Sequence, residues 1–208
     1  MTPEEFVKNG PRKPEDLIGK ARTVAKVFSL RAKSGNLLPI KLLCYGPPGI
    51  GKSATCRIIS RALVEHPLAL RHISAKQLTP DTLRDWMQDF RYHSDQWRVF
   101  WIEEIDAVSP DVEVLLLQFL DELPEKNAVL TTSNERMSGI SDRFQSRCQV
   151  IHFGKPTIED VEMFLSSRWP ELGVAAREIA ETNNGDVRAS LNDAQNELDM
   201  RKYGGEGL

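Results

Sequence analysis

Five short apolar runs recur along this chain, and helical patterns separate them. The runs are rich in Val, Ile, Leu and aromatic residues, as buried parallel strands tend to be. They cover residues 40–45, 70–74, 98–103, 128–133 and 148–153. Strand and helix alternating in this way predict an α/β fold, with three layers built around a five-stranded parallel sheet.

Helix start signals lie between the runs. Thr79-Pro80 and Ser109-Pro110 each combine an N-cap residue with a proline in the first turn. Another helix is expected at 51–65, directly after a glycine-rich turn. The helix that begins at Pro110 has an apolar face formed by Val112, Leu115, Leu116, Phe119 and Leu120.

The pattern becomes purely helical after residue 153. Thr157 and Asp160 have the spacing of a capping box, and a second helical segment ends at Gly185. We therefore expect a first domain at 1–154, a small all-helical domain at 155–203 and a disordered tail at 204–208. The last helix carries an apolar stripe of Val187, Leu191, Ala194 and Leu198.

Composition indicates a soluble intracellular protein. The 208 residues are 40% hydrophobic, which is enough for a substantial core, and the three cysteines lie far apart without a CxxC pair. No signal peptide or membrane span is apparent, so we expect a cytoplasmic protein, or a nuclear one in a eukaryote, without a membrane partner. The net charge is −3, yet residues 1–40 hold eight Lys or Arg against four Asp or Glu. This basic segment leaves room for a contact surface for the DNA backbone.

The glycine-rich turn GPPGIGKS carries the clearest chemistry. It matches G-x-x-x-x-G-K-[ST] and has a predicted strand before it and a predicted helix after it, as a phosphate-binding loop requires. Its backbone amides would face the phosphates of ATP, Lys52 would reach the β- and γ-phosphates, and the Ser53 hydroxyl would ligate Mg²⁺. The predicted nucleotide-binding residues are Gly46, Pro47, Pro48, Gly49, Ile50, Gly51, Lys52, Ser53 and Ala54.

Two glutamates follow the apolar core of the run at 98–103. Glu103 and Glu104 should lie at the carboxyl edge of the sheet, where ligands of open α/β sheets bind. Neighbouring residues on a strand point to opposite faces, which predicts different tasks for the two. We expect Glu103 to join Ser53 at the magnesium ion, and Glu104 to orient and deprotonate the attacking water.

Several motifs in order resemble those of a known family. GPPGIGKS, the acidic strand end, TTSN (131–134), SRC (146–148) and GDVR (185–188) are similar to those of AAA+ ATPases. Within that superfamily the chain resembles the clamp-loader group, such as replication factor C small subunits and bacterial clamp-loader ATPase subunits. The resemblance covers roughly residues 12–200 and includes KPEDLIGKAR before the first strand. It implies a P-loop AAA+ domain followed by a helical lid.

The resemblance also implies roles for polar residues outside the loop. Asn134 matches the sensor-1 residue, which holds the attacking water or the γ-phosphate, and Arg188 matches sensor 2 on the last lid helix. Arg147 of SRC matches the arginine that enters the ATP site of the adjacent subunit, and Arg143 of DRF is the alternative. A cation at that point would stabilise the transferring phosphoryl group. The charge of Arg147 would favour a lower pKa for the neighbouring Cys148 thiol, but the resemblance explains Cys148 as part of the SRC motif and we assign it no redox role.

The chain departs from the family pattern at three points. Glu103 stands where aspartate is usual, Ser53 replaces the commoner threonine, and no segment corresponds to the C-terminal collar that holds clamp loaders together. The longer Glu103 side chain would weaken or displace the bound metal.

Three functions fit these observations. The first is a clamp-loader-like ATPase that assembles with copies of itself or with related AAA+ subunits, in a ring or an open spiral, and places a sliding clamp on primer-template DNA. The second is another AAA+ remodeller acting on DNA: a helicase loader, a transposition regulator or a branch-migration motor. The third is an ATP-gated scaffold with little turnover.

Overall fold

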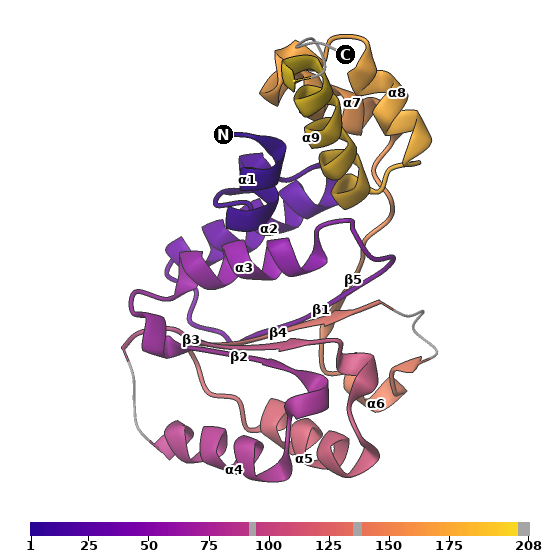
Figure 1. The fold of residues 1–208 in the computed structure, drawn as a ribbon. Helices are drawn as coiled ribbons and strands as arrows, with labels where there is room; N and C mark the ends of the chain where they lie inside the picture. Colours follow the sequence, from indigo (N-terminus) through magenta and orange to yellow (C-terminus); the bar gives the residue numbers. More distant parts are fainter. Residues whose placement is uncertain (92–94, 135–138, 204–208) are drawn as a thin grey trace.

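The computed structural model describes residues 1–91, 95–134 and 139–203, and these form a three-layer α/β unit with a helical lid (Figure 1). Within these residues five strands make one parallel sheet in the order β2-β3-β4-β1-β5. The predicted fold class is therefore confirmed. The strands are β1 (Ile40–Tyr45), β2 (Leu70–Ser74), β3 (Arg98–Glu103), β4 (Asn127–Ser133) and β5 (Gln149–His152).

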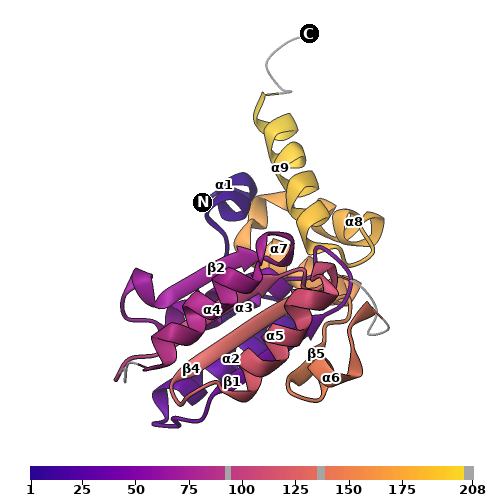
Figure 2. The same cartoon turned by 90° about the horizontal axis from the view of Figure 1, so that it is seen from below.

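Helices cover both faces of the sheet (Figures 1 and 2). One face carries α2 (Gly19–Lys33) and α3 (Lys52–Leu63), and the other carries α4 (Pro80–Gln88) and α5 (Pro110–Asp121). The short α6 (Asp142–Gln145) leads into β5. Short 3₁₀ turns lie at Pro14–Asp16, Pro67–Ala69, Ala75–Gln77, Asp89–Arg91, Ile105–Ala107 and Pro170–Leu172.

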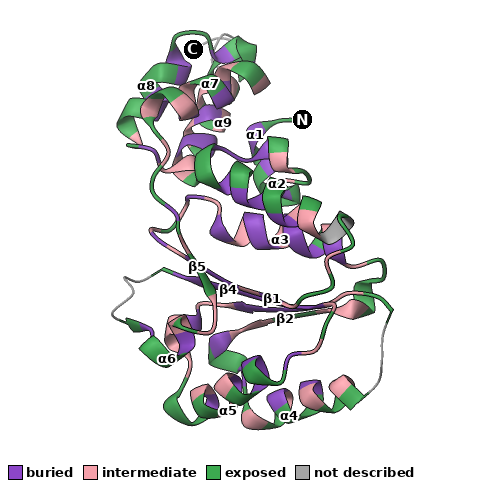
Figure 3. Ribbon diagram, turned by 180° about the vertical axis from the view of Figure 1, so that it is seen from behind, coloured by how far each residue is buried: buried purple, intermediate pink, exposed green. Residues whose placement is uncertain are grey.

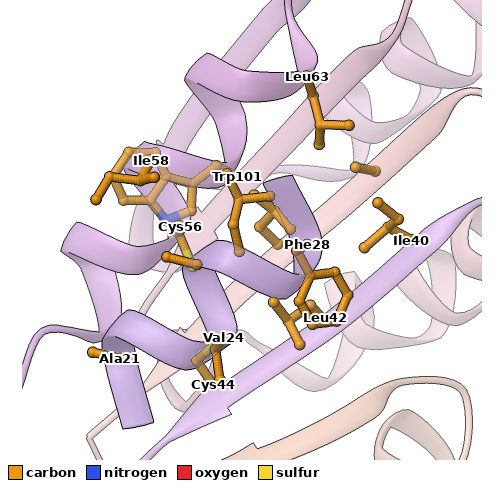
Figure 4. Packing of buried hydrophobic residues seen from close by; sticks show 14 of the residues in the cluster. Ala21, Val24, Phe28, Ile40, Leu42, Cys44, Cys56, Ile58, Leu63 and Trp101 are labelled. Atoms are coloured by element: carbon orange, nitrogen blue, oxygen red, sulfur yellow. The ribbon is translucent and has the colours of Figure 1, made fainter. Parts of the chain in front are cut away.

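Two apolar clusters hold the three layers together, and buried residues line both faces of the sheet (Figure 3). The first cluster packs α2 and α3 on the sheet and includes Phe28, Leu42 and Trp101 (Figure 4). The second packs α4 and α5 on the opposite face, where Phe100 and Phe119 meet edge-to-face at 5.0 Å. The central strands are buried on both sides, which explains why their sequences read as continuous apolar runs.

A third cluster builds the lid from α7 (Ile158–Arg168), α8 (Ala175–Thr182) and α9 (Val187–Tyr203). The capping box predicted for Thr157 and Asp160 is present at the start of α7. Tail residues 204–208 lie outside the described residues.

The N-terminal segment packs on the lid, an arrangement that the sequence pattern did not predict. Helix α1 (Pro3–Asn9) places Phe6 edge-on to Phe164 and Trp169, with ring centroids 5.8 and 6.0 Å away. Arg168 bonds Asp16 at 2.6 Å. The division at residue 154 stays a prediction, and these contacts tie the start of the chain to the region beyond it.

No helix within the described parts of the chain is long and apolar enough to cross a membrane.

Candidate nucleotide-binding and hydrolysis site

The glycine-rich loop joins the end of β1 to the start of α3, as the motif predicts. Two glycines are required there by close approach as well as by positive φ. A Cβ at Gly46 (φ 143°) would collide with the carbonyl oxygen of Phe153, and a Cβ at Gly49 (φ 79°) would collide with the carboxylate of Asp186. The loop is therefore packed between the sheet and the lid, with its backbone in a conformation that only glycine adopts without strain.

Lys52 is the first residue of α3 and is buried, with 5% of its surface exposed. Its Nζ donates to the carbonyl oxygens of Gly46 at 2.7 Å and Pro47 at 2.6 Å. Burial lowers the pKa of Lys52 to about 8. This ammonium group forms no ion pair with a carboxylate of the described residues, and phosphate oxygens would supply an anion.

The N-terminus of α3 completes a site for an anion. Its N-cap, Gly51, has a left-handed backbone and offers no side chain to the amides of the first turn. Those amides and the positive end of the helix favour a phosphate group. The loop conformation, the lysine and the helix end thus fit a nucleotide phosphate together.

A cavity of about 500 Å³ lies over this loop, between the sheet edge, the N-terminal segment and the lid. That volume is in the range of small-molecule sites. Gly46, Pro47, Arg143 and Arg147 do not line it. The predicted site residues that do line it are Pro48, Gly49, Ile50, Gly51, Lys52, Ser53, Ala54, Glu103, Glu104, Asn134 and Arg188.

Glu103 and Glu104 both reach the cavity because the backbone turns between them. Glu103 ends β3, while Glu104 takes a left-handed conformation with φ 56°. Simple strand alternation thus stops at Glu103. The amide of Glu104 donates to Thr132 Oγ1 at 3.3 Å, and its carboxylate lies 3.9 Å from Lys76 Nζ. A non-glycine residue in this conformation is costly and is often held at functional sites.

The other predicted polar groups lie around the same space. Asn134 follows β4 and is exposed, and Arg188 is exposed in the first turn of α9. Both line the cavity, one from the sheet and one from the lid. This brings together groups that are more than fifty residues apart in the sequence.

Ser53 and Glu103 line the cavity together and fit the requirements of a magnesium ion in part. Among the described residues, no group of three or more His, Cys, Asp or Glu side chains is placed to hold a metal. Mg²⁺ in nucleotide sites is held by one or two protein oxygens, with phosphate oxygens and water completing the shell. Two protein oxygen ligands are therefore compatible with magnesium bound with a nucleotide, and insufficient for a metal site of the protein alone.

Arg143 and Arg147 lie on the segment from α6 to β5, outside the cavity. Arg147 is held by Asp121 at the end of α5, with Nε 2.8 Å from Oδ1 and Nη2 2.9 Å from Oδ2. Arg143 is exposed, and its guanidinium has no hydrogen bond or ion pair within the described part of the chain. Neither arginine can serve its own chain's cavity from this position.

The charge of Arg147 acts on Cys148 in the expected direction, but burial outweighs it. Burial raises the pKa of the Cys148 thiol to about 12, and the nearby cations Lys41 and Arg147 lower it by less. The thiol packs beside the cluster of α4 and α5, where desolvation of a thiolate outweighs a neighbouring charge.

Sequence reasoning missed three residues near the site. Thr132 lines the cavity and fixes the Glu104 amide, Lys76 faces the Glu104 carboxylate, and Asp186 packs on the loop at Gly49. Asp186 Oδ1 accepts the Ala189 amide at 3.0 Å, so it caps α9. Its place just before the apolar stripe of that helix was a signal that could have found it. Lys76 carries no comparable local signal.

The strand-loop-helix unit, the acidic end of β3 and the lid over one cavity define a P-loop nucleotide-binding protein. The sequence profile of the ATPase family associated with various cellular activities (AAA) matches residues 42–155, more than half of the chain. The chain belongs to this family.

Relatives and solved structures agree with this class. The replication factor C small subunit of Methanocella arvoryzae is 25% identical over 204 residues, which cover 92% of this chain and 62% of that protein. The probable replication factor C subunit 2 of Dictyostelium discoideum is 25% identical over 196 residues, 87% of this chain and 56% of that protein. This chain thus spans less than two thirds of each relative. A solved structure of Thermotoga maritima RuvB superposes with a TM-score of 0.75 at 19% identity, over 94% of this chain and 67% of that one, which supports the fold.

Proposed function

We propose that this chain binds and hydrolyses ATP as one subunit of a clamp-loader-like assembly, with each active site shared between two chains. One observation carries the proposal: Lys52, Ser53 and Glu104 line the cavity, while Arg147 lies outside it. The resemblance to the clamp-loader group, together with relatives named as replication factor C subunits, supports loading of a sliding clamp on primer-template DNA as the output.

The residues of the cavity suggest how hydrolysis would proceed. Lys52 and the amides of α3 would bind the phosphates, and Asn134 would hold the attacking water. Glu104 would accept a proton from that water as its oxygen attacks the γ-phosphorus, while the bond from this phosphorus to the bridging oxygen of ADP breaks. Magnesium bound with the nucleotide would shield the charge of the phosphate oxygens.

Arg188 would link the nucleotide to lid position. It stands in the first turn of α9, whose cap Asp186 packs against the loop at Gly49. A phosphate drawn to Arg188 would alter the contact between lid and loop, and the chain would convert nucleotide state into a change of shape. The arginine that completes the site, Arg147 or in its place Arg143, would come from a neighbouring copy or a related AAA+ subunit.

The test mixes two inactive variants, Lys52→Ala and Arg147→Ala. Each alone should hydrolyse ATP poorly. Their mixture should regain activity because some interfaces pair an intact cavity with an intact Arg147. If both variants fold and associate but the mixture stays inactive, Arg147 does not act in trans. Stimulation of turnover by primed DNA and a sliding clamp tests the clamp-loading output, and stimulation by DNA alone would favour another AAA+ remodeller.

A second function, an ATP-gated scaffold with little turnover, is favoured by the contact of Lys76 with Glu104. A lysine beside the general base would draw its carboxylate away from water. Lys76→Ala distinguishes the two: faster hydrolysis with unchanged ATP affinity would mean that Lys76 restrains an active ATPase. Turnover that stays negligible in Lys76→Ala, with primed DNA and clamp present, would support the scaffold.

A further inference from the structure

Three side chains near the edge of the sheet contact one another in series, and only one of them, Glu103, belongs to the predicted magnesium site. His72 lies on β2, directly opposite Trp101 in the register with β3. The two rings stack with centroids 3.8 Å apart and planes at 13°. His72 Nε2 lies 3.3 Å from Oε2 of Glu103, at the end of β3. His72 thus contacts the predicted magnesium ligand Glu103 and stacks on Trp101.

The tryptophan is a fixed support. Trp101 is 2% exposed and belongs to the cluster beneath α3, together with Cys56 and Ile58 (Figure 4). A side chain in a close-packed core holds one rotamer. The stack therefore fixes the plane of the His72 ring, although 41% of that side chain is exposed.

Of these three side chains, Glu103 is the one that reaches the cavity. It lines the space over the loop, whereas His72 does not. Its Oε2 faces His72, and its Oε1 has no hydrogen-bond partner within the described residues. Glutamate has one more rotatable bond than aspartate, so a carboxylate at this position needs an outside contact to keep a single orientation.

We propose that His72 is a positioning residue of the cation site: it holds one oxygen of Glu103 so that the other faces a divalent ion bound with the nucleotide. This inference rests on the proposed function, because it requires a nucleotide over the loop. It explains how a glutamate serves at the end of β3 in spite of its flexible side chain. Partners that orient a ligand in this way contribute strongly to metal affinity.

The test measures how binding of a fluorescent ATP analogue depends on magnesium. His72→Ala should raise the Mg²⁺ concentration at half-saturation by about tenfold, as loss of an orienting partner does at other metal sites. Affinity for the analogue in EDTA should stay at the wild-type value. His72→Gln should restore most of the magnesium affinity, since its amide Nε2 can reach the same carboxylate oxygen.

Arg71→Ala provides a matched control on the same strand. Arg71 precedes His72, so its side chain leaves the opposite face of the sheet, and it contacts Asp89 at 3.3 Å. Its removal tests for a general disturbance of β2 and should leave the magnesium dependence unchanged. Thermal unfolding of each variant confirms that it is folded.

Five outcomes distinguish the possibilities. A tenfold shift in His72→Ala that His72→Gln reverses, with Arg71→Ala unchanged, supports the proposal. An unchanged magnesium dependence in His72→Ala overturns it, as does an equal shift in Arg71→Ala. If Glu103→Gln has no effect on the magnesium dependence of binding, Glu103 is not a magnesium ligand and His72 has no positioning role. That result would leave the proposed nucleotide site unaffected. If Lys52→Ala binds the analogue as well as the wild type does, the proposed function falls too.

Discussion

Arg147 and Asp121 form a two-point ion pair that ties the segment between α6 and β5 to the end of α5. Arg147 also donates to the carbonyl oxygen of Arg143 at 2.9 Å. The hydrogen bond from Arg147 lowers the pKa of the Asp121 carboxyl. The arginine is thus held in one orientation on the surface, away from its own chain's cavity.

Arg147→Ala should reduce ATP turnover of the assembled protein by about 10³-fold or more, the effect of losing an arginine that stabilises the transition state. Nucleotide affinity of the isolated chain should not change, because Arg147 does not line the cavity. Asp121→Asn keeps the guanidinium and removes its charged partner, so it should reduce turnover far less. Steady-state ATPase assays with equilibrium nucleotide binding make the comparison. If Arg143→Ala loses more ATP turnover than Arg147→Ala does, Arg143 is the arginine that completes the neighbouring site.

Gly49→Ala should weaken ATP binding and destabilise the fold. Gly35→Ala is the matched control, because Gly35 has a similar φ of 73° but open space where a Cβ would stand. The left-handed backbone should cost about 1 kcal/mol of unfolding free energy in each variant. Gly49→Ala should lose more, since its Cβ would displace Asp186 and the lid. Urea unfolding and nucleotide titration measure both effects, and equal losses in the two variants would show that contact with Asp186 is unimportant.

Asp16→Asn should make the free energy of unfolding less dependent on pH in the acidic range. Burial favours a raised pKa for Asp16, yet hydrogen bonds from the Arg168 side chain and from the Arg12 and Lys13 amides outweigh it and hold this pKa below its usual range. The ionised carboxylate therefore stabilises the fold above its unfolded-state pKa of about 3.9, and this contribution is lost as the pH falls through the lower folded-state pKa.

At pH 7 the variant should be less stable by roughly 1–3 kcal/mol, the cost of losing a hydrogen bond to a charged group and leaving Arg168 without its anion. The difference in unfolding free energy between the wild type and Asp16→Asn should become smaller below about pH 4. Urea unfolding at several pH values measures it. A gap that stays constant down to pH 3 would contradict this account.

Cys148 should resist alkylation at pH 8, because burial raises its pKa to about 12 and leaves almost no thiolate. Cys44 and Cys56 are fully buried and should also be protected. Labelling with iodoacetamide, followed by peptide mass spectrometry, should modify all three thiols only after denaturation. Rapid modification of Cys148 in the folded chain would mean that Arg147 activates it after all.

The central strands were predicted well because burial on both faces leaves an unmistakable apolar run. β1 and β3 have the predicted bounds, and β4 begins one residue early, at Asn127. The edge strand β2 also has the predicted bounds although none of its residues is buried, and β5 is one residue shorter than predicted at each end. Helix α2 was missed although Ala21, Val24, Ala25 and Phe28 have the spacing of a buried helical face. The start of α2 carries no capping signal, because its N-cap is Ile18 and its first residue is Gly19.

The candidate site likewise contains residues that local sequence signals predicted and residues that they did not. The loop and the acidic strand end carry local signals, because their chemistry depends on neighbouring residues. The left-handed turn at Glu104 depends on Thr132, and the pair of Arg147 with Asp121 spans 26 residues. Such contacts arise from the packing of distant elements and leave no periodic trace in the sequence. Longer-range contacts, such as His72 with Glu103, were invisible for the same reason.

The packing of Phe6 against Phe164 and Trp169 has a consequence for synthesis on the ribosome. Phe6 is made more than 150 residues before its aromatic partners. Helix α1 has only seven residues, too few to be stable alone in water. During synthesis the side chain of Phe6 therefore stays exposed to solvent until α7 and Trp169 have left the ribosome. The sheet could form during that interval, so Phe6 would leave the ribosome before every strand and still reach its final contacts after them.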